Sequence, residues 1–565
     1  MSIAPLAFIF RALSPMGYFE KLIVEIAQEH VSCFGTQFDE NHGRFILKVS
    51  GSKEELTSLS DALSTLPVSL FFYFEKVELL DEKEAIEPCL DSTFPPFLFE
   101  SQRPLQSFAL SQTLDEQTRF PYNGHLFLDG VDVLGDDEAK EGVIALSFRA
   151  LAQKLIEGEE LYFQTLYGAK ILSLRPQNRE WILPLDLASL ELLFRVSKAQ
   201  ASALASWEKP VLFLPPKQLL ADEIESTHTQ KLSLHAPIVI AFGEAVVLPY
   251  DNALQILALC LKEQGIDALY VRHCALGEKE MRERYPNAFI APFITTSPLL
   301  LTVTDNSTFF VLSKERSMLA YPSYARLLAD DGDTLPRDCV CVHLSYDLPT
   351  VGAILQQGRL KKVLHIAFPL RVGMWLQDIM HDETGAKLLQ NFKKAYPQIE
   401  NLLFDESMHK IHLTSTHQSN NIFDILGIVY QLLYDETIDL ASAKARMLAF
   451  AEGFLGQNGP RIDFKLAASE NGVQLTHLSI LRSAMSFRLA GVDEQTLAFG
   501  ILESLAEFFG NFIRDLCENF VLDTAIVSGS MLSFTPLANR LLHFMPPNIT
   551  LVLPTNNALD CIRYS

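Results

Sequence analysis

Three histidines, His409, His412 and His417, stand close together in one polar stretch of the sequence. Imidazole is a common ligand of divalent transition metals, so a cluster of this kind could hold a metal ion. The same spacing also fits exposed imidazoles flanking a short strand. We favour this second interpretation and expect no metal at these histidines.

Cysteine, the other common ligand of soft metals, is sparse, with eight residues in a chain of 565. No two cysteines have the two-residue gap that lets a pair of thiolates share a zinc ion, which argues against a zinc ribbon or a disulfide scaffold. Cys339 and Cys341 alternate with apolar residues. We therefore expect two thiols on one face of a strand, packed as small apolar groups.

The charge balance excludes several classes of partner. The chain has 46 Lys and Arg against 69 Asp and Glu, a net charge of −23. A surface this acidic repels phosphate backbones and anionic lipid headgroups. The sequence has no uninterrupted apolar run of about 18 residues that could span a bilayer, and its first residues lack the basic region of a secretory signal. We expect a cytoplasmic protein that neither binds nucleic acid nor inserts into a membrane.

The apolar periodicity of residues 1–80 predicts the order strand, helix, strand, helix, strand. Ser52 precedes the second helix and Glu55 follows three residues later, which is the spacing of a capping box. The other expected elements are strands over 6–12, 44–49 and 69–77 and a helix over 18–29. Range 1–80 is therefore predicted to be a small two-layer α+β domain.

The rest of the chain alternates strands with helices, which is typical of α/β domains. Residues 81–140 begin with an acidic, proline-containing stretch and are expected to form a linker. Residues 141–290 predict a second unit, with one helix over 187–204, and residues 291–565 predict a third, larger unit. The predicted fold class is multi-domain α/β.

Several short segments, taken in order, resemble one known family. They are Leu234-His235-Ala236-Pro237, Leu248-Pro249-Tyr250, Thr414-Ser415 with residues 421–427, Tyr434-Asp435-Glu436 and Val527-Ser528-Gly529-Ser530. Together they resemble the HypF-type hydrogenase maturation carbamoyltransferases. That family joins an acylphosphatase-like domain of the ferredoxin type, two zinc fingers, a YrdC-like domain and a sugar-kinase-like domain of the actin-type ATPase class. The resemblance implies that 1–80, 141–290 and 291–565 correspond to the first, third and fourth of these.

The resemblance also implies a metal and nucleotide site in the third unit. The family's metal site uses two histidines four residues apart, and His343 and Asp347 have that spacing. A histidine and a carboxylate could together hold a divalent ion that orients nucleotide phosphates. The residues implied in nucleotide binding are Ser415, Asp424, Ser528, Gly529, Ser530 and Asn557.

The chain departs from the family pattern at the positions that grip anions and metals. Phe19 stands where the acylphosphatase-like loop has an arginine, so bidentate phosphate recognition is lost. A lone His125 stands near the place of the zinc-binding cysteines. Asn557 and Pro369 replace aspartates of the ATPase-like domain, and Gly529-Ser530 replaces a Gly-Gly turn. We expect no zinc-finger zinc, and at most residual binding of ATP and a divalent metal.

The YrdC-like unit retains Gly168 but has no recognisable cluster of basic residues after it. Its nearby cations are Arg175, Arg179 and Lys209. Since isolated Lys and Arg usually lie on solvated faces, we expect ordinary surface charges at all three positions.

Two functions are compatible with this pattern. The first is an accessory protein in the assembly of a nickel–iron hydrogenase, a carbamoyltransferase-like pseudoenzyme that binds hydrogenase subunits or other maturation proteins. The second is an ATP-dependent carbamoyltransferase with altered active-site residues. A role in tRNA modification is disfavoured by the acidic charge. We favour the first hypothesis and predict no catalytic residue.

Overall fold

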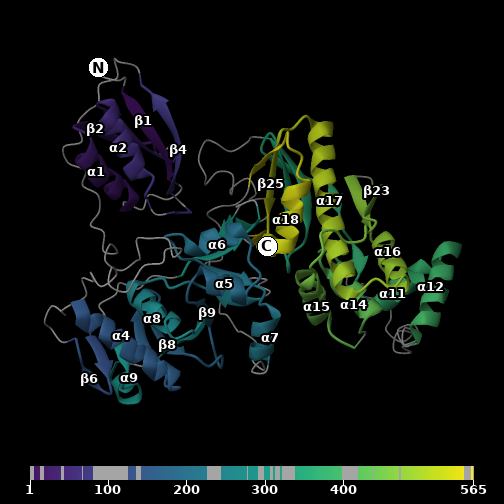
Figure 1. Cartoon of the computed structure of the whole chain (residues 1–565). Coiled ribbons are helices and arrows are strands. Elements are labelled where there is room, and N and C mark those ends of the chain that lie inside the picture. Colours follow the sequence, from purple (N-terminus) through teal and green to yellow (C-terminus); the bar gives the residue numbers. More distant parts are fainter. Residues whose placement is uncertain are drawn as a thin grey trace. The chain divides into compact units, whose positions relative to one another are not determined.

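The computed structural model divides the chain into two compact units (Figure 1). Unit 1 comprises residues 1–231 and 244–299, and unit 2 comprises residues 232–243 and 300–565. The described residues are 5–12, 18–39, 43–66, 68–70, 72–80, 125–134, 141–225, 243–275, 278–290, 298–305, 309–311, 319–320, 338–397, 418–435, 437–469, 472–552 and 562–563.

The first part of unit 1 is an antiparallel sheet packed against two helices (Figure 1). Its elements are β1 (Leu6–Ala12), α1 (Tyr18–His30), β2 (Cys33–Asp39), β3 (Arg44–Ser50), α2 (Lys53–Leu63) and β4 (Phe72–Leu79). The strand order is β2-β3-β1-β4. The predicted capping box is present, because Ser52 N–H donates to the Glu55 carboxylate at 2.6 Å and Glu55 N–H donates to Ser52 Oγ at 3.3 Å.

Strand β2 was not predicted from the sequence. It lies at an edge of the sheet, and of its seven residues Gly35 alone is buried. An edge strand that buries so little has no clear apolar alternation, so the sequence signal is weak. Its addition makes the order βαββαβ rather than βαβαβ.

The second part of unit 1 is built on a mixed sheet. In spatial order its strands are β10 (Val211–Leu214), β11 (Glu244–Val246), β9 (Trp181–Pro184), β12 (Ala268–His273), β8 (Gly168–Ser173), β7 (Leu161–Thr165), β13 (Ala288–Ile290), β5 (His125–Leu128) and β6 (Val131–Asp132). The helices are α4 (Glu141–Ile156), α5 (Leu187–Leu193), α6 (Lys198–Ala205), α7 (Gln218–Glu225), α8 (Asn252–Lys262) and α9 (Glu278–Arg284). Strands β5 and β6 fall within the range 81–140 assigned above to a linker, and β5 pairs antiparallel with β13.

Residues 187–204 form two helices instead of the single predicted helix. Phe194 ends α5 in an extended conformation and is fully buried. Ser197 then caps α6, because its side chain accepts from Gln200 N–H while the Gln200 side chain accepts from Ser197 N–H. A Ser followed three residues later by Gln is a helix start signal, and it outweighs the continuous apolar periodicity.

Unit 2 contains a mixed sheet in the order β19 (Arg359–Lys362), β18 (Val351–Gln356), β17 (Cys339–His343), β25 (Thr524–Ser528) and β26 (Thr550–Val552). Strands β17, β25 and β26 are parallel, so their carboxyl ends lie at one edge. Smaller sheets comprise β20 (Leu364–His365) with β24 (Gly472–Thr476) and β23 (Lys465–Ser469), β21 (Phe368–Pro369) with β22 (Gln418–Ser419), and β16 (Leu319–Ala320) with β27 (Ile562–Arg563). Strands β14 (Leu300–Val303) and β15 (Phe309–Val311) pair antiparallel.

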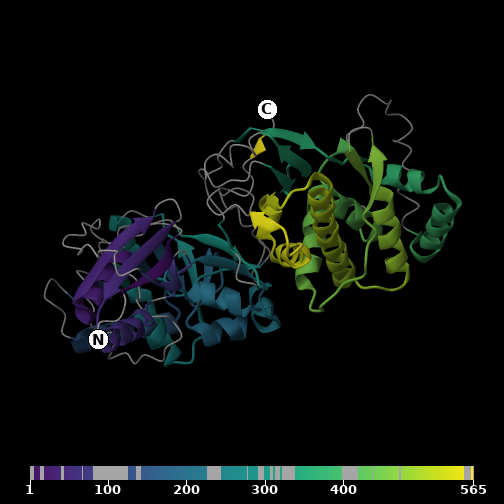
Figure 2. The ribbon, with the colours of Figure 1, turned by 90° about the horizontal axis from the view of Figure 1, so that it is seen from above.

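The helices of unit 2 cover these sheets. They are α11 (Val372–Ile379), α12 (Glu383–Ala395), α14 (Asp424–Leu433), α15 (Leu440–Gly453), α16 (His477–Leu489), α17 (Glu494–Phe520) and α18 (Thr535–Phe544), with a 3₁₀ turn at Ser530–Ser533. Helix α17 runs alongside β17 and β25 (Figures 1 and 2). Among the described residues it alone has the length and composition to cross a membrane, and most of its apolar stretch is buried inside unit 2, as in a core helix.

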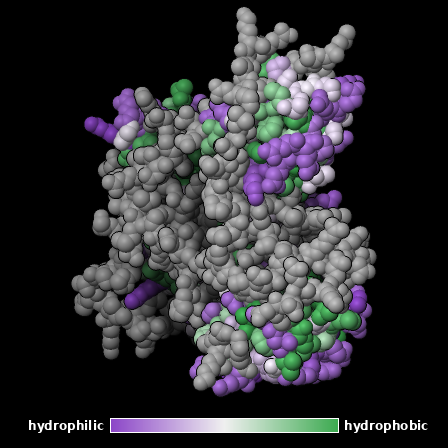
Figure 3. All heavy atoms as spheres, turned by 90° about the vertical axis from the view of Figure 1, so that its left-hand side faces the viewer, coloured by the Kyte–Doolittle hydropathy of each residue, from purple (hydrophilic) through white to green (hydrophobic). Residues whose placement is uncertain are grey.

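The face of the molecule shown in Figure 3 mixes hydrophilic and hydrophobic residues. Across unit 1, the large apolar side chains that reach solvent include Leu79 at the end of β4, Val131 in β6 and Leu146 in α4. Exposed single apolar residues are common on protein surfaces and need no partner.

Candidate functional site

The carboxyl ends of β17 and β25 bring His343 and Ser528 together. The two residues are register partners in the parallel pair, and His343 Nδ1 lies 3.0 Å from Ser528 Oγ. The His343 side chain is 1% exposed, and burial lowers the pKa of its imidazole to about 3. His343 is therefore neutral at physiological pH. In open α/β sheets, ligands bind beside the carboxyl ends of parallel strands, so this edge is the candidate site.

A tight turn at Gly529 closes against the loop that follows β17. Gly529 has φ +116°, a conformation that side-chain-bearing residues rarely adopt, and a Cβ here would lie 2.1 Å from the carbonyl oxygen of Leu344. Met531 N–H donates to the same carbonyl at 3.0 Å. Ser530 Oγ accepts from Tyr346 N–H at 3.0 Å. The segment 528–530 thus holds the 344–346 loop through main-chain and hydroxyl contacts.

His343 and Asp347, the suggested metal pair, lie in different environments. His343 is buried, whereas Asp347 is exposed. The Asp347 N–H donates to Ser345 Oγ at 3.3 Å, which is a turn interaction. Within the described ranges, no three His, Cys, Asp or Glu side chains are grouped so that they could hold a metal ion.

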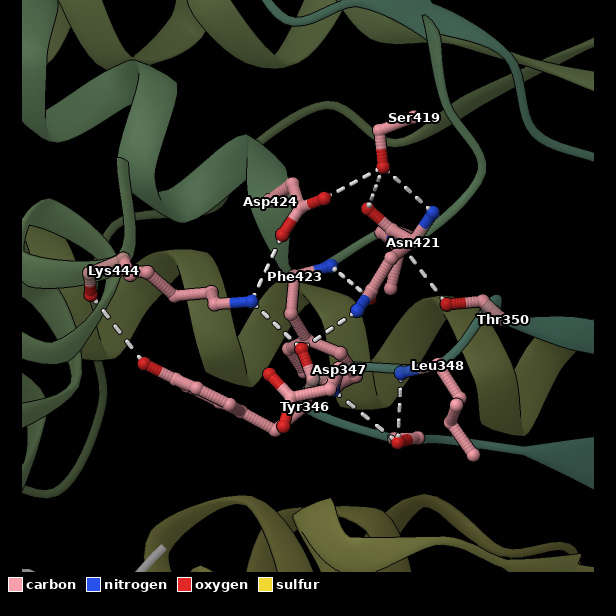
Figure 4. A network of polar contacts seen from close by, with 12 residues as sticks. Tyr346, Asp347, Leu348, Thr350, Ser419, Asn421, Phe423, Asp424 and Lys444 are labelled. Carbon is pink, nitrogen blue, oxygen red and sulfur yellow. Dashed lines mark hydrogen bonds and ion pairs between the residues drawn. The ribbon is translucent and has the colours of Figure 1, made fainter. Parts of the chain in front are cut away.

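Asp424 lies at the start of α14 and binds two side chains of its own unit (Figure 4). Its Oδ1 accepts from Lys444 Nζ at 2.8 Å, and its Oδ2 accepts from Ser419 Oγ at 2.7 Å. The Lys444 side chain is 6% exposed and that of Asp424 is 18% exposed, so the ion pair is largely buried. Both carboxylate oxygens are therefore engaged within the chain.

Lys444 also reaches the loop that follows β17. Its ammonium group donates to the Tyr346 carbonyl at 2.7 Å and lies 4.0 Å from the centre of the Tyr346 ring. Asn421 Nδ2 donates to the same carbonyl at 2.7 Å, and its Oδ1 accepts from Phe423 N–H at 3.0 Å (Figure 4). One polar network therefore connects five residues, and we call it the Lys444 network. Its members are Tyr346, Ser419, Asn421, Asp424 and Lys444.

The sequence analysis missed Lys444 as a member of this network, although a signal exists. Positions 444, 447, 448 and 451 follow helical spacing on the buried face of α15, and the last three are apolar. A lysine on the apolar stripe of a helix predicts a buried partner for its charge. The partner is Asp424, 20 residues earlier in the chain.

Several residues named above lie outside the described residues. Two of them, Ser415 and Asn557, were suggested as nucleotide-binding positions. Three more are the clustered histidines His409, His412 and His417. The remaining suggested positions divide between the strand edge, which holds Ser528, Gly529 and Ser530, and the Lys444 network, which holds Asp424. Tyr346 contacts both groups, through its N–H and its carbonyl.

Phe19, which stands in place of the family's arginine, belongs to the core of the first part of unit 1. Its side chain is 0% exposed. The ring stacks on Phe72 with centroids 5.1 Å apart and meets Trp207 edge-on at 5.6 Å. Beside Trp207, the buried Glu208 accepts from Leu70 N–H at 3.0 Å and from Ser69 Oγ. This position is therefore hydrophobic and closely packed.

Two of the three cations expected on the surface of unit 1 are buried, which corrects that expectation. The Arg179 side chain is 4% exposed because its guanidinium pairs with Glu244 at 2.8 Å and donates to the Pro176 carbonyl. Lys209 is 1% exposed, with Nζ donating to the Ala205 carbonyl at 2.9 Å. Arg179 thus has a carboxylate partner inside the unit, and the Lys209 ammonium group has a carbonyl acceptor, so neither buried cation lacks a polar partner.

Gly168 belongs to a buried aromatic and polar cluster. It forms the β7–β8 turn with φ +84°, and Thr165 Oγ1 donates to its carbonyl at 2.7 Å. Tyr250 OH donates to Thr165 Oγ1 at 3.1 Å, and its ring lies 4.3 Å from that of Tyr167. The adjacent Asp251 caps α8, and full burial raises the pKa of its carboxyl group to about 7.

Comparison with known proteins places these features in a family. No family model matches the chain. Protein HydE of Wolinella succinogenes is 32% identical over 579 residues, covering 99% of this chain and all of that protein. HypF from T. kodakarensis matches with a TM-score of 0.58 at 11% identity, covering 98% of this chain and 96% of the other.

A second HypF crystal structure, in a phosphate- and nucleotide-bound form, matches with a TM-score of 0.51 at 10% identity, over 100% of this chain and 96% of that one. The two structural matches establish the multi-domain α/β fold class that was predicted. The 32% identity to HydE extends over 99% of the chain, and it therefore shows family membership as well as fold. The chain belongs to the HypF-like hydrogenase maturation family, as the sequence resemblance indicated.

Proposed function

We propose that this protein is a cytoplasmic accessory protein in the assembly of a nickel–iron hydrogenase. In this role it keeps the HypF scaffold and binds a hydrogenase subunit or another maturation protein without transferring a carbamoyl group. The observation that carries the proposal is the Lys444 network, in which the Asp424 carboxylate accepts from Lys444 and Ser419. A carboxylate whose two oxygens are so engaged has little charge left for a metal–nucleotide complex.

Two further observations support the proposal. The two suggested metal ligands lie in different environments, because His343 is buried and Asp347 is exposed. A bound divalent ion usually draws on several carboxylates. Phe19 occupies a core position against Phe72 and Trp207, where an arginine would grip phosphate in the family. The replacement by Phe19 removes a positive charge from a position at which the family handles anions.

Affinity purification of the tagged full-length chain from cells that express the hydrogenase tests this function. We expect a hydrogenase subunit or maturation protein to be recovered. Deletion of the gene should abolish hydrogenase activity while the active-site ligands are still inserted. Recovery of no such protein, together with normal activity in the deletion strain, would remove the proposal.

ATP-dependent carbamoyl transfer is the second candidate, favoured by the tight Gly529 turn at the carboxyl ends of β17 and β25. Purified protein given ATP, magnesium and carbamoyl phosphate would then release AMP and pyrophosphate. Nucleotide binding should also raise the melting temperature, since a ligand of the native state stabilises it. We expect neither effect, and turnover would replace the assembly proposal.

A further inference from the structure

Strand β19 lies at one end of the five-stranded sheet of unit 2, and within the described residues it pairs with β18 alone. The two strands are joined by Gln357 and Gly358, whose φ angles of +51° and +74° are typical of a two-residue type I′ turn. In a hairpin of this kind the residues that flank the turn, here Gln356 and Arg359, exchange main-chain hydrogen bonds. The turn therefore fixes the direction in which each main-chain group of β19 points.

The outer edge of β19 presents the main-chain groups of Leu360 and Lys362. Because hydrogen-bonded and non-hydrogen-bonded pairs alternate along an antiparallel ladder, the N–H and C=O groups of these two residues point away from β18. Val363 N–H, one residue further on, donates to the Gly352 carbonyl of β18 at 2.9 Å, as this alternation requires. The edge can therefore form main-chain hydrogen bonds with one more extended segment.

Three of the four residues of β19 are cations without a carboxylate partner. Arg359 and Lys361 are exposed on one face of the strand, and Lys362 is half-buried on the other. None of the three side chains makes an ion pair or a hydrogen bond with a described residue. Burial lowers the pKa of the Lys362 ammonium group, and no described carboxylate offsets this effect. Other cations of unit 2 are paired with carboxylates, among them Lys444, Arg461, Lys465 and Arg514.

We propose that the outer edge of β19 binds an extended acidic segment of a partner protein. The segment would add to the sheet as a further strand and would form main-chain hydrogen bonds with Leu360 and Lys362. Carboxylates at alternate positions of the segment would face Arg359 and Lys361. The inference rests on the proposed assembly role only for the identity of the partner.

The unpaired cations select this occupant. Lysine on an edge strand deters pairing with a neutral strand. A second copy of β19 would bring cations directly opposite cations, which destabilises a sheet. An acidic strand avoids both costs and gives Lys362 the partner that it lacks. The net charge of −23 acts more weakly than these three cations, because charges more than about 8 Å away are largely screened at physiological salt.

Fluorescence anisotropy on the full-length protein tests the inference with a labelled peptide of sequence TEVEVEVT, blocked at both ends. We expect saturable binding. The basic counterpart TKVKVKVT should bind about tenfold more weakly, because attraction becomes repulsion. The peptide TEVEPEVT keeps every carboxylate but interrupts the strand with proline, and it should also bind about tenfold more weakly.

Variants of the protein locate the binding edge. Arg359→Glu and Lys361→Glu should each weaken binding of TEVEVEVT about tenfold, because a carboxylate then faces the carboxylates of the peptide. Both side chains are exposed, so the substitutions should leave the fold intact. Lys394→Glu is the matched control. It makes the same charge change at an exposed position of α12, outside β19, and should leave binding within about twofold.

Three results would overturn the inference. One is the absence of saturable binding at a peptide concentration of about 1 mM. Another is equal affinity for TEVEVEVT and TEVEPEVT, or an equal loss in Lys394→Glu and Lys361→Glu, because either would indicate attraction to charge alone. The third is a wild-type dimer, detected by sedimentation, that Lys361→Glu abolishes, because the edge would then pair with a second copy. Failure to recover a hydrogenase protein would count against the proposed function and leave this peptide result unaffected.

Discussion

The ammonium group of Lys444 lies 2.8 Å from the Asp424 carboxylate, which joins α15 to the start of α14. The same ammonium group donates to the carbonyl of Tyr346 in the loop after β17. One buried charge therefore connects two helices to the edge of the central sheet of unit 2. Removing either partner would leave the other charge buried without compensation.

Lys444→Met should lower the free energy of unfolding of unit 2 by about 3 kcal/mol, because Asp424 keeps its charge and loses its partner. The double variant Lys444→Met with Asp424→Asn should recover part of this loss, since no ion then remains. Urea unfolding of both variants measures the difference. If the double variant is as unstable as the sum of the two single variants, the residues do not act as a pair.

His343 should make unit 2 sensitive to acid. Its pKa is lowered from 6.5 to about 3 in the folded protein, so the unfolded chain binds the proton more readily. The stability that the neutral imidazole contributes is complete above pH 6.5 and is lost as the pH falls toward 3. His343→Gln should flatten this dependence. Unfolding curves at several pH values test it, and an unchanged acid dependence in the variant would assign the effect to other groups.

Asp251 should act in the opposite direction in unit 1. Its pKa is raised from 3.8 to about 7 by burial, so the folded state binds the proton more readily, and stability declines as the pH rises through this range. Asn can also cap a helix, so Asp251→Asn should be more stable than wild type above pH 7.

Asp186→Asn is the matched control for Asp251→Asn. Asp186 caps α5, and hydrogen bonds from Ser189 together with Lys262 lower the pKa of its carboxyl group despite the opposing effect of partial burial. The charged form is the favoured one at this cap, so the control variant should lose stability at neutral pH. Stabilisation of both variants above pH 7 would contradict the assignment for Asp251.

Phe19→Arg, which restores the residue type of the family, should not restore phosphate chemistry. The guanidinium would enter a core between Phe72 and Trp207, and we expect a loss of roughly 3 kcal/mol or more from burying an uncompensated charge. Phe19→Leu keeps the position apolar and should cost less than half as much. Thermal unfolding and acyl phosphate hydrolysis are the measurements. A stable, hydrolytically active Phe19→Arg protein would contradict this account of the site.

Local signals in the sequence predicted local structure well. The Ser52–Glu55 box and strand β1 lie where the spacing indicated, because each depends on residues close together in the chain. Strand β2 and the break at Phe194 were missed. The first depends on pairing with β3, and the second depends on a cap that competes with a continuous apolar pattern.

The site was harder to predict than the elements. The positions of Ser528 and Gly529 could be predicted from a local strand–turn–helix pattern. Ser528 ends strand β25 and Gly529 forms the turn after it, at the carboxyl edge of the sheet. The environment of Asp424 depends on Lys444 in another helix, and that of Phe19 depends on Trp207, almost 190 residues away in the sequence. The apolar stripe of α15 signals that Lys444 has a buried partner, but periodicity and spacing do not identify a partner that is distant in the chain.

Trp207 and Glu208 have a practical consequence for dissecting this protein. An expression fragment that stopped near residue 80 would lack the indole that covers Phe19 and the carboxylate that holds the Ser69 and Leu70 segment. Its surface would gain an apolar patch, and we expect it to aggregate. Fragments intended for crystallisation or interaction screening should therefore extend beyond residue 208.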